Sequence, residues 1–319
     1  MQSYTRKKRG FLGLPGELRN MIYEFYFRAN LRCEIVAQSH TFEEPPRRIF
    51  KLSSNVLRSQ MKVSINGEES SEPWTCVRLS RLLGQYNVVK GLQTSWPTSL
   101  VALHLVCRLL LNEVLIFMYR ETQFCFNAPK RINNFLGVIS TSNLQNITKL
   151  QLHYSTYGQP SAHCDKVWQQ KNHKSWLVSF RSAAKNLVNL KELEIWVCVN
   201  DVAPKLSLRE EWVQPLLQFR RLTRHKSLLA IERSSSSQKG LQLVKVHVRT
   251  HAVDLIERSD GQGGSLPRAG RELEAIFGQS IGLAILGTKE GEAMAAFNEA
   301  WEGRHRSWQH HLGFAGTGW

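Results

Sequence analysis

The chain has 319 residues, of which 42% are apolar, so it can bury one large hydrophobic core or two smaller ones, and wholesale disorder is excluded. The formal net charge is +16, from 42 basic and 26 acidic residues, and it is spread along the chain without one dominant basic block. Such a charge permits contact with nucleic acid or an acidic partner, but it says nothing about the fold.

The six cysteines are scattered along the chain, and no two lie within three residues of each other. The N-terminus is polar and basic, without the pattern of a secretory signal. We therefore expect free thiols in a reducing compartment, cytoplasmic or nuclear, with most of the cysteines packed as small core residues.

The first predicted element is a helix that follows a basic tail at residues 1–10. Pro15 suits the first helical position because it has no N–H group to leave unpaired. Apolar side chains then recur at i, i+4, i+7 and i+8, which places them in one stripe: Leu18, Ile22, Phe25 and Tyr26. The stripe is expected to pack on the chain's own core. The alternative is that part of it stays available to the groove of a partner.

Two short strands and a polar segment are predicted next. Residues 31–36 alternate like a strand, and residues 48–52 can pair with them across a Glu-Glu-Pro-Pro turn at 43–46. Residues 64–73 are polar and are predicted to form a loop, whereas residues 74–93 have no clear pattern.

The strongest predicted helix lies in the almost continuously apolar run at residues 99–119, with Pro97 as a start signal. Arg108 and Glu113 in the middle of this run argue against a membrane span, because each central charge costs about 2.5–3.5 kcal/mol in a bilayer. Apolar residues recur at alternating spacings of three and four: Leu100, Leu103, Cys107, Leu110, Val114 and Phe117. Because further apolar residues flank this stripe, we expect the central helix to be buried on most sides.

Helices and strands alternate beyond this helix, starting with a strand at 123–126 and a helix at 132–139. A repeat of the form L-x-N-aliphatic-x-x-L-x-aliphatic begins at Leu144 and again at Leu187, and a third unit from Leu241 keeps the apolar spacing without the Asn. Helical segments precede the three units, at 131–140, 174–186 and 209–222. This order predicts an α/β fold with a small, largely parallel sheet and right-handed crossovers. The region is leucine-rich-repeat-like, but its spacing exceeds the roughly 20–29 residues of ordinary leucine-rich repeats.

Two breaks and two helices complete the chain. Residues 234–239 form a low-complexity break, and residues 259–266 form a Gly-rich one. Helices are predicted at 271–277 and 290–301, and residues 313–319 are predicted to be a loose tail.

The familiar enzyme motifs are missing: a phosphate-binding loop, a dinucleotide-binding glycine pattern, a nucleophile elbow and a zinc-protease His pair. The nearest local combination of metal ligands supplies only one loose half of a zinc site: His163, Cys164, Asp165 and His173. Cys107 stands beside Arg108, but the apolar stripe predicts a buried structural thiol rather than a nucleophile. We therefore expect no enzymatic activity, no metal and no cofactor.

Two ordered motifs resemble those of the F-box-like proteins of filamentous fungi. The first reads Leu-Pro-Gly-Glu-Leu-Arg-Asn-Met-Ile-Tyr at residues 14–23. The second begins with Val-Cys-Arg at 106–108, continues through Glu113 and Tyr119, and ends with Phe-Cys-Phe at 124–126. Together the motifs span roughly residues 11–155, and the α/β region behind them is compatible with the resemblance.

The resemblance implies a protein-interaction function. In F-box proteins a short helical module binds a Skp-type adaptor, and a C-terminal domain captures a substrate for ubiquitination. By resemblance, four residues would contact the adaptor: Leu14, Pro15, Leu18 and Ile22. Four others form the second, structural motif: Cys107, Arg108, Glu113 and Tyr119. Pro15 and Cys107 are much farther apart than in an ordinary F-box, so the first helix can instead serve as core. Exposure of Leu14, Leu18 and Ile22 discriminates between these interpretations.

The sequence therefore divides into a basic tail (1–10), an F-box-like N-terminal region with inserted strands (11–130), the leucine-rich-repeat-like α/β region (131–258), and a Gly-rich linker with C-terminal helices and a tail (259–319). The favoured function is a substrate-recruiting subunit of a ubiquitin ligase, with a Skp-type adaptor and an unknown client as partners. One alternative is a scaffold with no ligase role. The other is a basic nuclear protein that binds nucleic acid, with a basic stripe at residues 220–226 as the contact and residues 6–9 as an import signal. No membrane association is expected.

Overall fold

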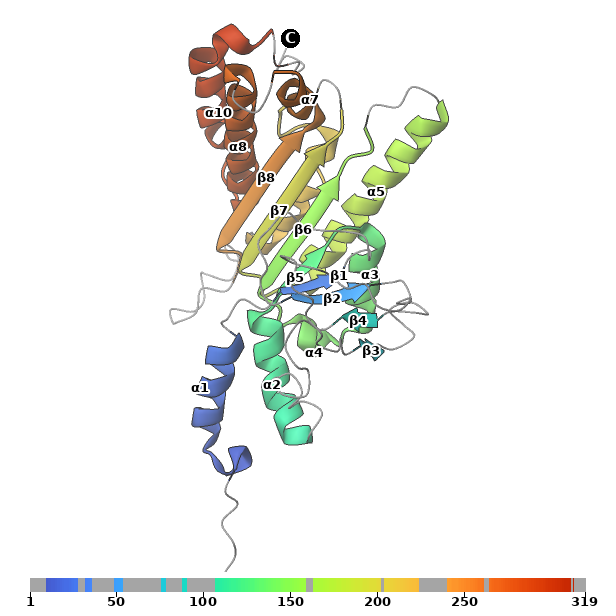
Figure 1. The fold of residues 1–319 in the computed structure, drawn as a ribbon, viewed down its shortest axis with the longest axis vertical. Helices are drawn as coiled ribbons and strands as arrows, with labels where there is room; N and C mark the ends of the chain where they lie inside the picture. The colour runs from blue at the N-terminus through green and yellow to red at the C-terminus, as the bar shows by residue number, and fades with distance from the viewer. Residues whose placement is uncertain are drawn as a thin grey trace, which may run out of the picture. The chain divides into compact units, whose positions relative to one another are not determined.

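The computed structural model of the chain describes residues 10–27, 32–35, 49–53, 76–78, 88–90, 107–158, 163–201, 204–223, 240–260, 264–310 and 312. The chain forms two compact units (Figure 1). The first comprises Met1–Glu34 and Gln38–Gln123, and the second comprises Ile35–Ala37 and Phe124–Trp319. The second unit thus includes both the predicted α/β region and the predicted C-terminal helices. Four predicted segments lie outside the described residues: 1–9, 64–73, 234–239 and 313–319.

The first unit contains two main helices and several short strands. Its helical elements are η1 (Phe11–Gly13), α1 (Gly16–Phe27) and α2 (Arg108–Glu121). Its strands are β1 (Arg32–Ile35, whose last residue belongs to the second unit), β2 (Ile49–Ser53), β3 (Cys76–Arg78) and β4 (Val88–Lys90). Both β2 and β3 pair antiparallel with β4. The two strands predicted at 31–36 and 48–52 are confirmed.

The start of α2 differs from the prediction. Cys107 has extended backbone angles, with φ −158° and ψ 162°, and it is the N-cap residue, so the helix begins at Arg108. Cys107 is therefore not part of the helical stripe. The predicted start at Pro97 lies outside the described residues.

The burial of α2 also differs from the prediction. Leu110, Val114 and Tyr119 are buried, but Leu109 and Ile116 are exposed. The prediction of burial on most sides is therefore wrong. Among the described residues of this unit, α1 covers one side of α2. The apolar residues on either side of the buried α2 stripe make its apolar surface wider than the area that α1 covers.

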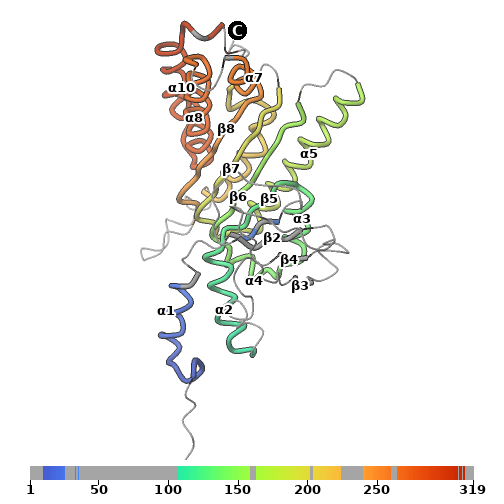
Figure 2. Tube along the Cα trace, in the orientation of Figure 1, coloured from blue at the N-terminus to red at the C-terminus, as the bar shows by residue number. Residues whose placement is uncertain are grey.

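The second unit is built on the strands β5 (Gln123–Phe126), β6 (Lys149–Ser155), β7 (Glu192–Val199) and β8 (Leu243–Thr250), in that order. β7 pairs parallel with β6 on one side and with β8 on the other (Figure 2). The registers align the repeat units residue by residue, since Leu150 lies beside Leu193, which lies beside Val244. The predicted α/β class and the parallel arrangement of the three repeat units are confirmed.

The Asn of the repeat links one unit to the next. The Asn189 side chain donates a hydrogen bond from Nδ2 to the carbonyl of Gln145, 2.8 Å away, and so connects the turns before β6 and β7. The register of β7 and β8 places Gly240 at the equivalent position of the third unit, where its φ of +122° lies in the left-handed region. Glycine adopts this conformation without the steric cost of a side chain. Glycine therefore stands in the third unit where the other two units carry Asn.

Helices cover one face of this sheet. Along β7 every second side chain is buried beneath them: Leu193, Ile195, Val197 and Val199. The covering elements are α5 (His163–Asn186), η5 (Glu211–Val213), η6 (Leu216–Arg220) and α8 (Ser265–Leu286). The rings of Phe180 and Phe219 join α5 to η6 with centroids 5.5 Å apart, and those of Trp212 and Phe277 join η5 to α8 at 5.8 Å. These contacts place the helices in one layer.

Two predicted helices are replaced by shorter elements. The segment 209–222 contains η5 and η6, two short 3₁₀ helices on either side of Pro215. Proline has no N–H group for an α-helical hydrogen bond, so it divides the segment. The helix predicted at 290–301 likewise consists of α9 (Glu290–Ala293), α10 (Ala295–Glu299) and a π-helical turn (Ala300–Arg304), followed by η8 (Arg306–Trp308).

The other helices of the second unit agree with the predictions in position. α3 (Pro129–Val138) lies at the predicted 132–139, with the short α4 (Thr141–Leu144) behind it. α5 begins at His163, ahead of the predicted residue 174, and α8 extends beyond the predicted 271–277 at both ends. No helix in the described part of the chain is both long and apolar enough to cross a bilayer.

The contact between α8 and β8 is unusually close. A Cβ atom on Gly278 would lie 2.2 Å from the carbonyl oxygen of Val246, and one on Gly282 would lie 3.3 Å from that of Val244. Because glycine has no Cβ, it allows the helix backbone to approach the strand at these points. α8 is therefore an integral part of the core of the second unit (Figure 1).

A buried carboxylate joins α8 to the end of β8 and the start of α7 (His251–Asp260). Glu274 accepts hydrogen bonds from the backbone N–H and the hydroxyl of Thr250, both at 2.6 Å. The Thr250 hydroxyl also accepts from the N–H of Val253 at 3.3 Å, which makes it a cap for α7. No residue separates β8 from α7, and this helix is not among the predicted elements.

Candidate functional site

A polar network joins α1 to α2 within the first unit. Arg19 donates from Nε and Nη2 to the two carboxylate oxygens of Glu113, at 3.0 and 2.6 Å. The Arg19 Nη1 donates to the carbonyl of Leu14 at 2.6 Å, and the Tyr23 hydroxyl donates to Glu113 at 3.1 Å. Glu113 thus accepts three hydrogen bonds from α1, and the two-point contact with Arg19 has the geometry of a strong, directional ion pair.

The network shifts the pKa values of its members. The hydrogen bond from Arg19 lowers the pKa of Glu113, against the opposing effect of burial, and the Tyr23 hydroxyl lowers it further. Burial raises the pKa of Tyr23 to about 12, and Glu113 contributes to this rise. The hydrogen bond to Glu113 raises the pKa of Arg19, although burial opposes it. At neutral pH the network therefore contains a carboxylate, a guanidinium and a protonated phenol.

Apolar contacts surround this network. Tyr23 is fully buried with Leu110 and Val114, and its ring lies between those of Phe11 and Phe117, with centroids 5.7 and 5.6 Å away. These contacts fix one face of α1 against α2.

The structural motif residues occupy different environments. Glu113 lies in the network, and Cys107 is half-buried against the same apolar cluster. Tyr119 is buried, and burial raises its pKa to about 12. Arg108 is exposed at the first position of α2. The motif thus brings Glu113 and Cys107 to α1, whereas the Arg108 side chain faces solvent.

The opposite face of α1 is apolar and exposed. The exposed fractions are 46% for Leu18, 51% for Met21, 37% for Ile22 and 71% for Phe25. Their spacing of i, i+3, i+4 and i+7 places them on one side of the helix. We call these four residues the α1 face. For Leu18, Ile22 and Phe25 the prediction that the stripe packs on the chain's own core is wrong, because the buried side of α1 carries Arg19 and Tyr23 instead.

The four predicted partner contacts therefore differ in accessibility. Leu18 and Ile22 belong to the α1 face, and Pro15 is also exposed. Leu14 is half-buried, and its carbonyl is engaged by Arg19. Sequence reasoning did not select Arg19, Met21 or Phe25 as site residues. The pairing of Arg19 with Glu113 carries a weak sequence signal, since each stands in one of the two motifs.

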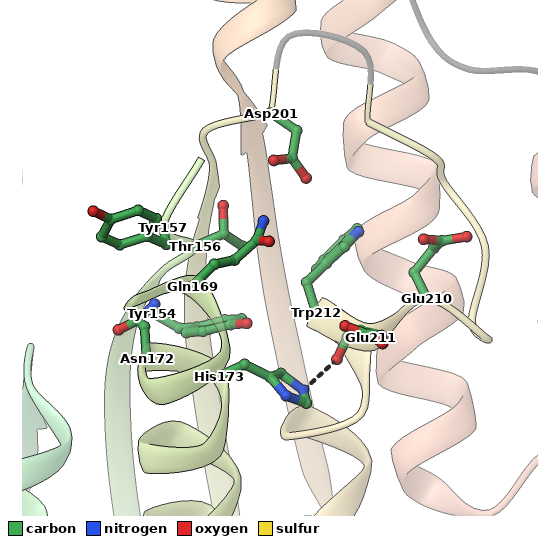
Figure 3. A pocket seen from close by; sticks show the side chains of 10 residues that line it. All are labelled: Tyr154, Thr156, Tyr157, Gln169, Asn172, His173, Asp201, Glu210, Glu211 and Trp212. Carbon is green, nitrogen blue, oxygen red and sulfur yellow. Dashed lines mark hydrogen bonds between the residues drawn. The ribbon is translucent and has the colours of Figure 1, made fainter. Parts of the chain in front are cut away.

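A second candidate site is a pocket of about 230 Å³ in the second unit, at the ends of β6 and β7 (Figure 3). Three residues at or after the end of β6 line it, namely Tyr154, Thr156 and Tyr157, and Asp201 lines it beyond the end of β7. In sheets of parallel strands, ligands bind at this carboxyl edge.

The other walls of the pocket come from α5 and the segment around η5. Gln169, Asn172 and His173 line it from α5, while Glu210, Glu211 and Trp212 line it from the opposite side. His173 Nε2 lies 2.7 Å from the carbonyl oxygen of Glu211, and since that oxygen can only accept, Nε2 carries the proton. This bond joins α5 to η5 across the pocket floor.

The side-chain amides of two α5 residues hold the edge of the pocket. Gln169 donates to the carbonyl of Gly158 at 2.9 Å, and Asn172 donates to that of Ser155 at 3.3 Å. The segment after β6 is thereby tied to the helix. No sequence motif predicts this pocket, because its residues are spread between 154 and 212. The sequence feature that could have indicated the pocket is the run of polar residues directly after β6 and after β7.

The remaining predicted sites receive little support from the geometry. In the described part of the chain, no group of three or more His, Cys, Asp or Glu side chains could hold a metal ion. Cys164 is exposed near Asp165, and His173 is engaged by Glu211 as described above. Of the five cysteines whose exposure is described, only Cys125 is buried; Cys33 and Cys107 are half-buried, and Cys164 and Cys198 are exposed, so the prediction that most are core residues is wrong.

The basic segment at 220–226 is only partly described. Arg220 is half-buried, and its Nη2 donates to the carbonyl of Gly287 at 3.2 Å. This guanidinium therefore serves a contact inside the second unit. Residues 224–226 of the stripe that the nucleic-acid alternative needs lie outside the described residues, and so do residues 6–9, its import signal.

Comparison with known proteins identifies a family but no activity. A family model described as "Domain of unknown function (DUF7730)" matches residues 5–227. The match contains α1, α2 and all the residues that line the pocket, and it ends before β8. No curated protein and no solved structure matches the chain.

Proposed function

The chain belongs to the DUF7730 family, and from its geometry we propose that it is a non-enzymatic protein-interaction module that binds a partner through the α1 face. The observation that carries this proposal is the inverted orientation of α1. Arg19 and Tyr23 are turned inward to Glu113, and four large apolar side chains are turned to solvent.

The exposure of this face has an energetic consequence. Fully burying a large apolar side chain contributes about 1.5–3 kcal/mol, and in the described structure the chain gains only part of this from the partly exposed α1 face. Binding of the α1 face in a complementary groove of a partner would contribute this burial free energy to the complex. Apolar residues at i, i+3, i+4 and i+7 are the anchors by which a helix binds in such a groove.

The F-box-like resemblance indicates which kind of partner would bind the α1 face. By that resemblance, Leu18 and Ile22 contact a Skp-type adaptor, and the second unit holds the client of a ubiquitin ligase. The rival proposal is a scaffold with the same binding face and no ligase role. The two differ in one measurable property, which is affinity for the adaptor.

The test is binding of the full chain to a purified Skp-type adaptor. Leu18→Ser combined with Ile22→Ser removes half of the α1 face without touching Arg19, Tyr23 or Glu113. We expect this variant to bind at least tenfold more weakly than the unchanged chain. The matched control is Val178→Ser with Leu283→Ser, which changes two exposed apolar residues on helices of the second unit. It should bind like the unchanged chain.

The outcomes separate the proposals. If the unchanged chain does not bind the adaptor, the ligase role is rejected and the scaffold remains. If it binds but both double variants bind equally well, the α1 face is not the binding site.

A further inference from the structure

The pocket at the carboxyl edge of β6 and β7 has a charge opposite to that of the chain. The net charge of the chain is +16, yet three carboxylates line this pocket: Asp201, Glu210 and Glu211. Burial raises the pKa of Asp201. Burial also raises the pKa of Glu210, Lys205 lowers it, and Glu211 and Asp201 raise it further. The carboxylates are thus close enough to repel one another, and a bound cation would relieve that repulsion.

A buried, unpartnered donor provides an independent indication of a ligand. Trp212 is only 7% exposed, and its indole Nε1 has no hydrogen-bond partner in the structure. Figure 3 shows Nε1 on the edge of the ring that faces the region between Asp201 and Glu210. Buried indole N–H groups normally have an acceptor, so this one is placed to donate to a bound molecule.

The arrangement selects an organic cation over a metal ion. Among the described residues, no three carboxylate, His or Cys side chains converge as metal ligands do. Aromatic rings of Tyr154, Tyr157 and Trp212 also line the pocket, and such rings attract ammonium and guanidinium groups through their faces. A volume of about 230 Å³ is smaller than that of pockets for drug-sized ligands, roughly 300–1,000 Å³. It suits a single side chain or a small amine.

We propose that this pocket binds an organic cation, an ammonium or guanidinium group of the size of a basic side chain, between Asp201 and Glu210. The carboxylates accept hydrogen bonds from the cation, and Trp212 Nε1 donates to a carbonyl that lies a few bonds away from it. A lysine or arginine side chain within a peptide carries both features. The proposal does not depend on the α1 face, which belongs to the other unit.

The indole ¹H–¹⁵N signal of Trp212 in the full chain reports on this site, and Trp212→Phe identifies the signal by its loss. We expect Nα-acetyl-lysine N-methylamide to shift this signal saturably at neutral pH. Nα-acetyl-norleucine N-methylamide has the same four-carbon side chain without the terminal ammonium group, and it should leave the signal unchanged. Butylamine distinguishes the source of the cation. If butylamine and the lysine derivative bind with equal affinity, the site recognises the head group of a free amine. If the lysine derivative binds at least tenfold more tightly, the site recognises a basic side chain within a peptide.

The carboxylates are tested with isosteric amides. Asp201→Asn with Glu210→Gln should weaken binding of the lysine derivative at least tenfold, whereas Glu299→Gln, an exposed carboxylate on α10, should not change it. If the double variant melts earlier than the unchanged chain, each single substitution is measured in its place. The proposal is overturned if the norleucine derivative shifts the signal equally, if no cation shifts it, or if the amide variants retain full affinity.

Discussion

The helices α1 and α8 are attached to their neighbours in opposite ways. α1 presents Arg19 and Tyr23 to α2 and leaves the four apolar side chains of the α1 face exposed. α8 turns its apolar side chains inward and contacts β8 through glycine, so that Leu273, Phe277, Ile281 and Ile285 are completely buried.

The contrast teaches that an apolar stripe identifies a face that can be packed against but not what covers it. In α8 the apolar stripe is buried by other parts of the second unit, and the close backbone contact between α8 and β8 contributes to the core of that unit. In α1 the ion pair and the tyrosine supply the attachment, so the stripe remains available for a partner.

The largest expected effect comes from Gly278→Ala. The new Cβ would lie 2.2 Å from the Val246 carbonyl oxygen, and relief requires α8 and β8 to separate. We expect a loss of roughly 2–3 kcal/mol in the free energy of unfolding, measured by urea denaturation with circular dichroism.

Gly137→Ala is the matched control, because a Cβ at this α3 position meets no atom within 4 Å. It should stabilise the chain by about 0.4–1 kcal/mol through the smaller entropy of the unfolded state. Equal stability of the two variants would show that α8 does not approach β8 as closely as described.

The next effect concerns the attachment of α1. Glu113→Gln removes the counter-charge of Arg19, so α1 should open more often while the second unit stays intact. Hydrogen exchange of the amides at 16–27 measures this opening, and we expect clearly faster exchange there. Glu290→Gln is the control, because it breaks an exposed ion pair with Arg209, and such pairs contribute about 0–1 kcal/mol. Unchanged exchange in α1 would contradict the role of the network.

The same attachment should depend on pH. Arg19 lowers the pKa of Glu113 below the ordinary value of 4.5, so the folded state favours the carboxylate. The resulting stabilisation is present above the ordinary value and is lost as the pH falls through the lowered pKa. Protection of the α1 amides in the unchanged chain should therefore decrease on acidification below about pH 4.5. In Glu113→Gln this contribution should be absent, and a decrease of equal size would assign the effect to other carboxylates.

The smallest effect on stability is expected from Leu18→Ser with Ile22→Ser. These changes remove two large apolar side chains, but both are exposed, so the free energy of unfolding should change by less than about 0.5 kcal/mol for each. Urea denaturation measures it. A loss above 2 kcal/mol for the pair would place the α1 face within the core and remove the basis of the proposed function.

The sequence predicts the parallel strands well, because β6, β7 and β8 each carry a period-two pattern with the same spacing of Leu or Val. The register of Leu150, Leu193 and Val244 follows from that spacing. The orientation of α1 does not follow, since periodicity locates a stripe without saying what covers it. The contact that decides the orientation joins residues 94 positions apart.

The pocket and α7 are harder to predict for other reasons. The pocket depends on which strand ends lie side by side, a property of the folded sheet rather than of any local segment. α7 follows β8 without a turn residue, so the pattern of breaks that normally separates elements is missing.

The direct passage from β8 into α7 makes this point of the chain intolerant of insertion. One residue added between Thr250 and His251 would rotate the α7 side chains by about 100° around the helix axis. Ala252 and Val253, which are buried, would leave the core, and Thr250 could no longer serve both Glu274 and the start of α7. Natural insertions and engineered fusions should therefore avoid this junction. A junction between a strand and a helix usually contains a loop that accommodates insertions, but here the strand continues directly into the helix.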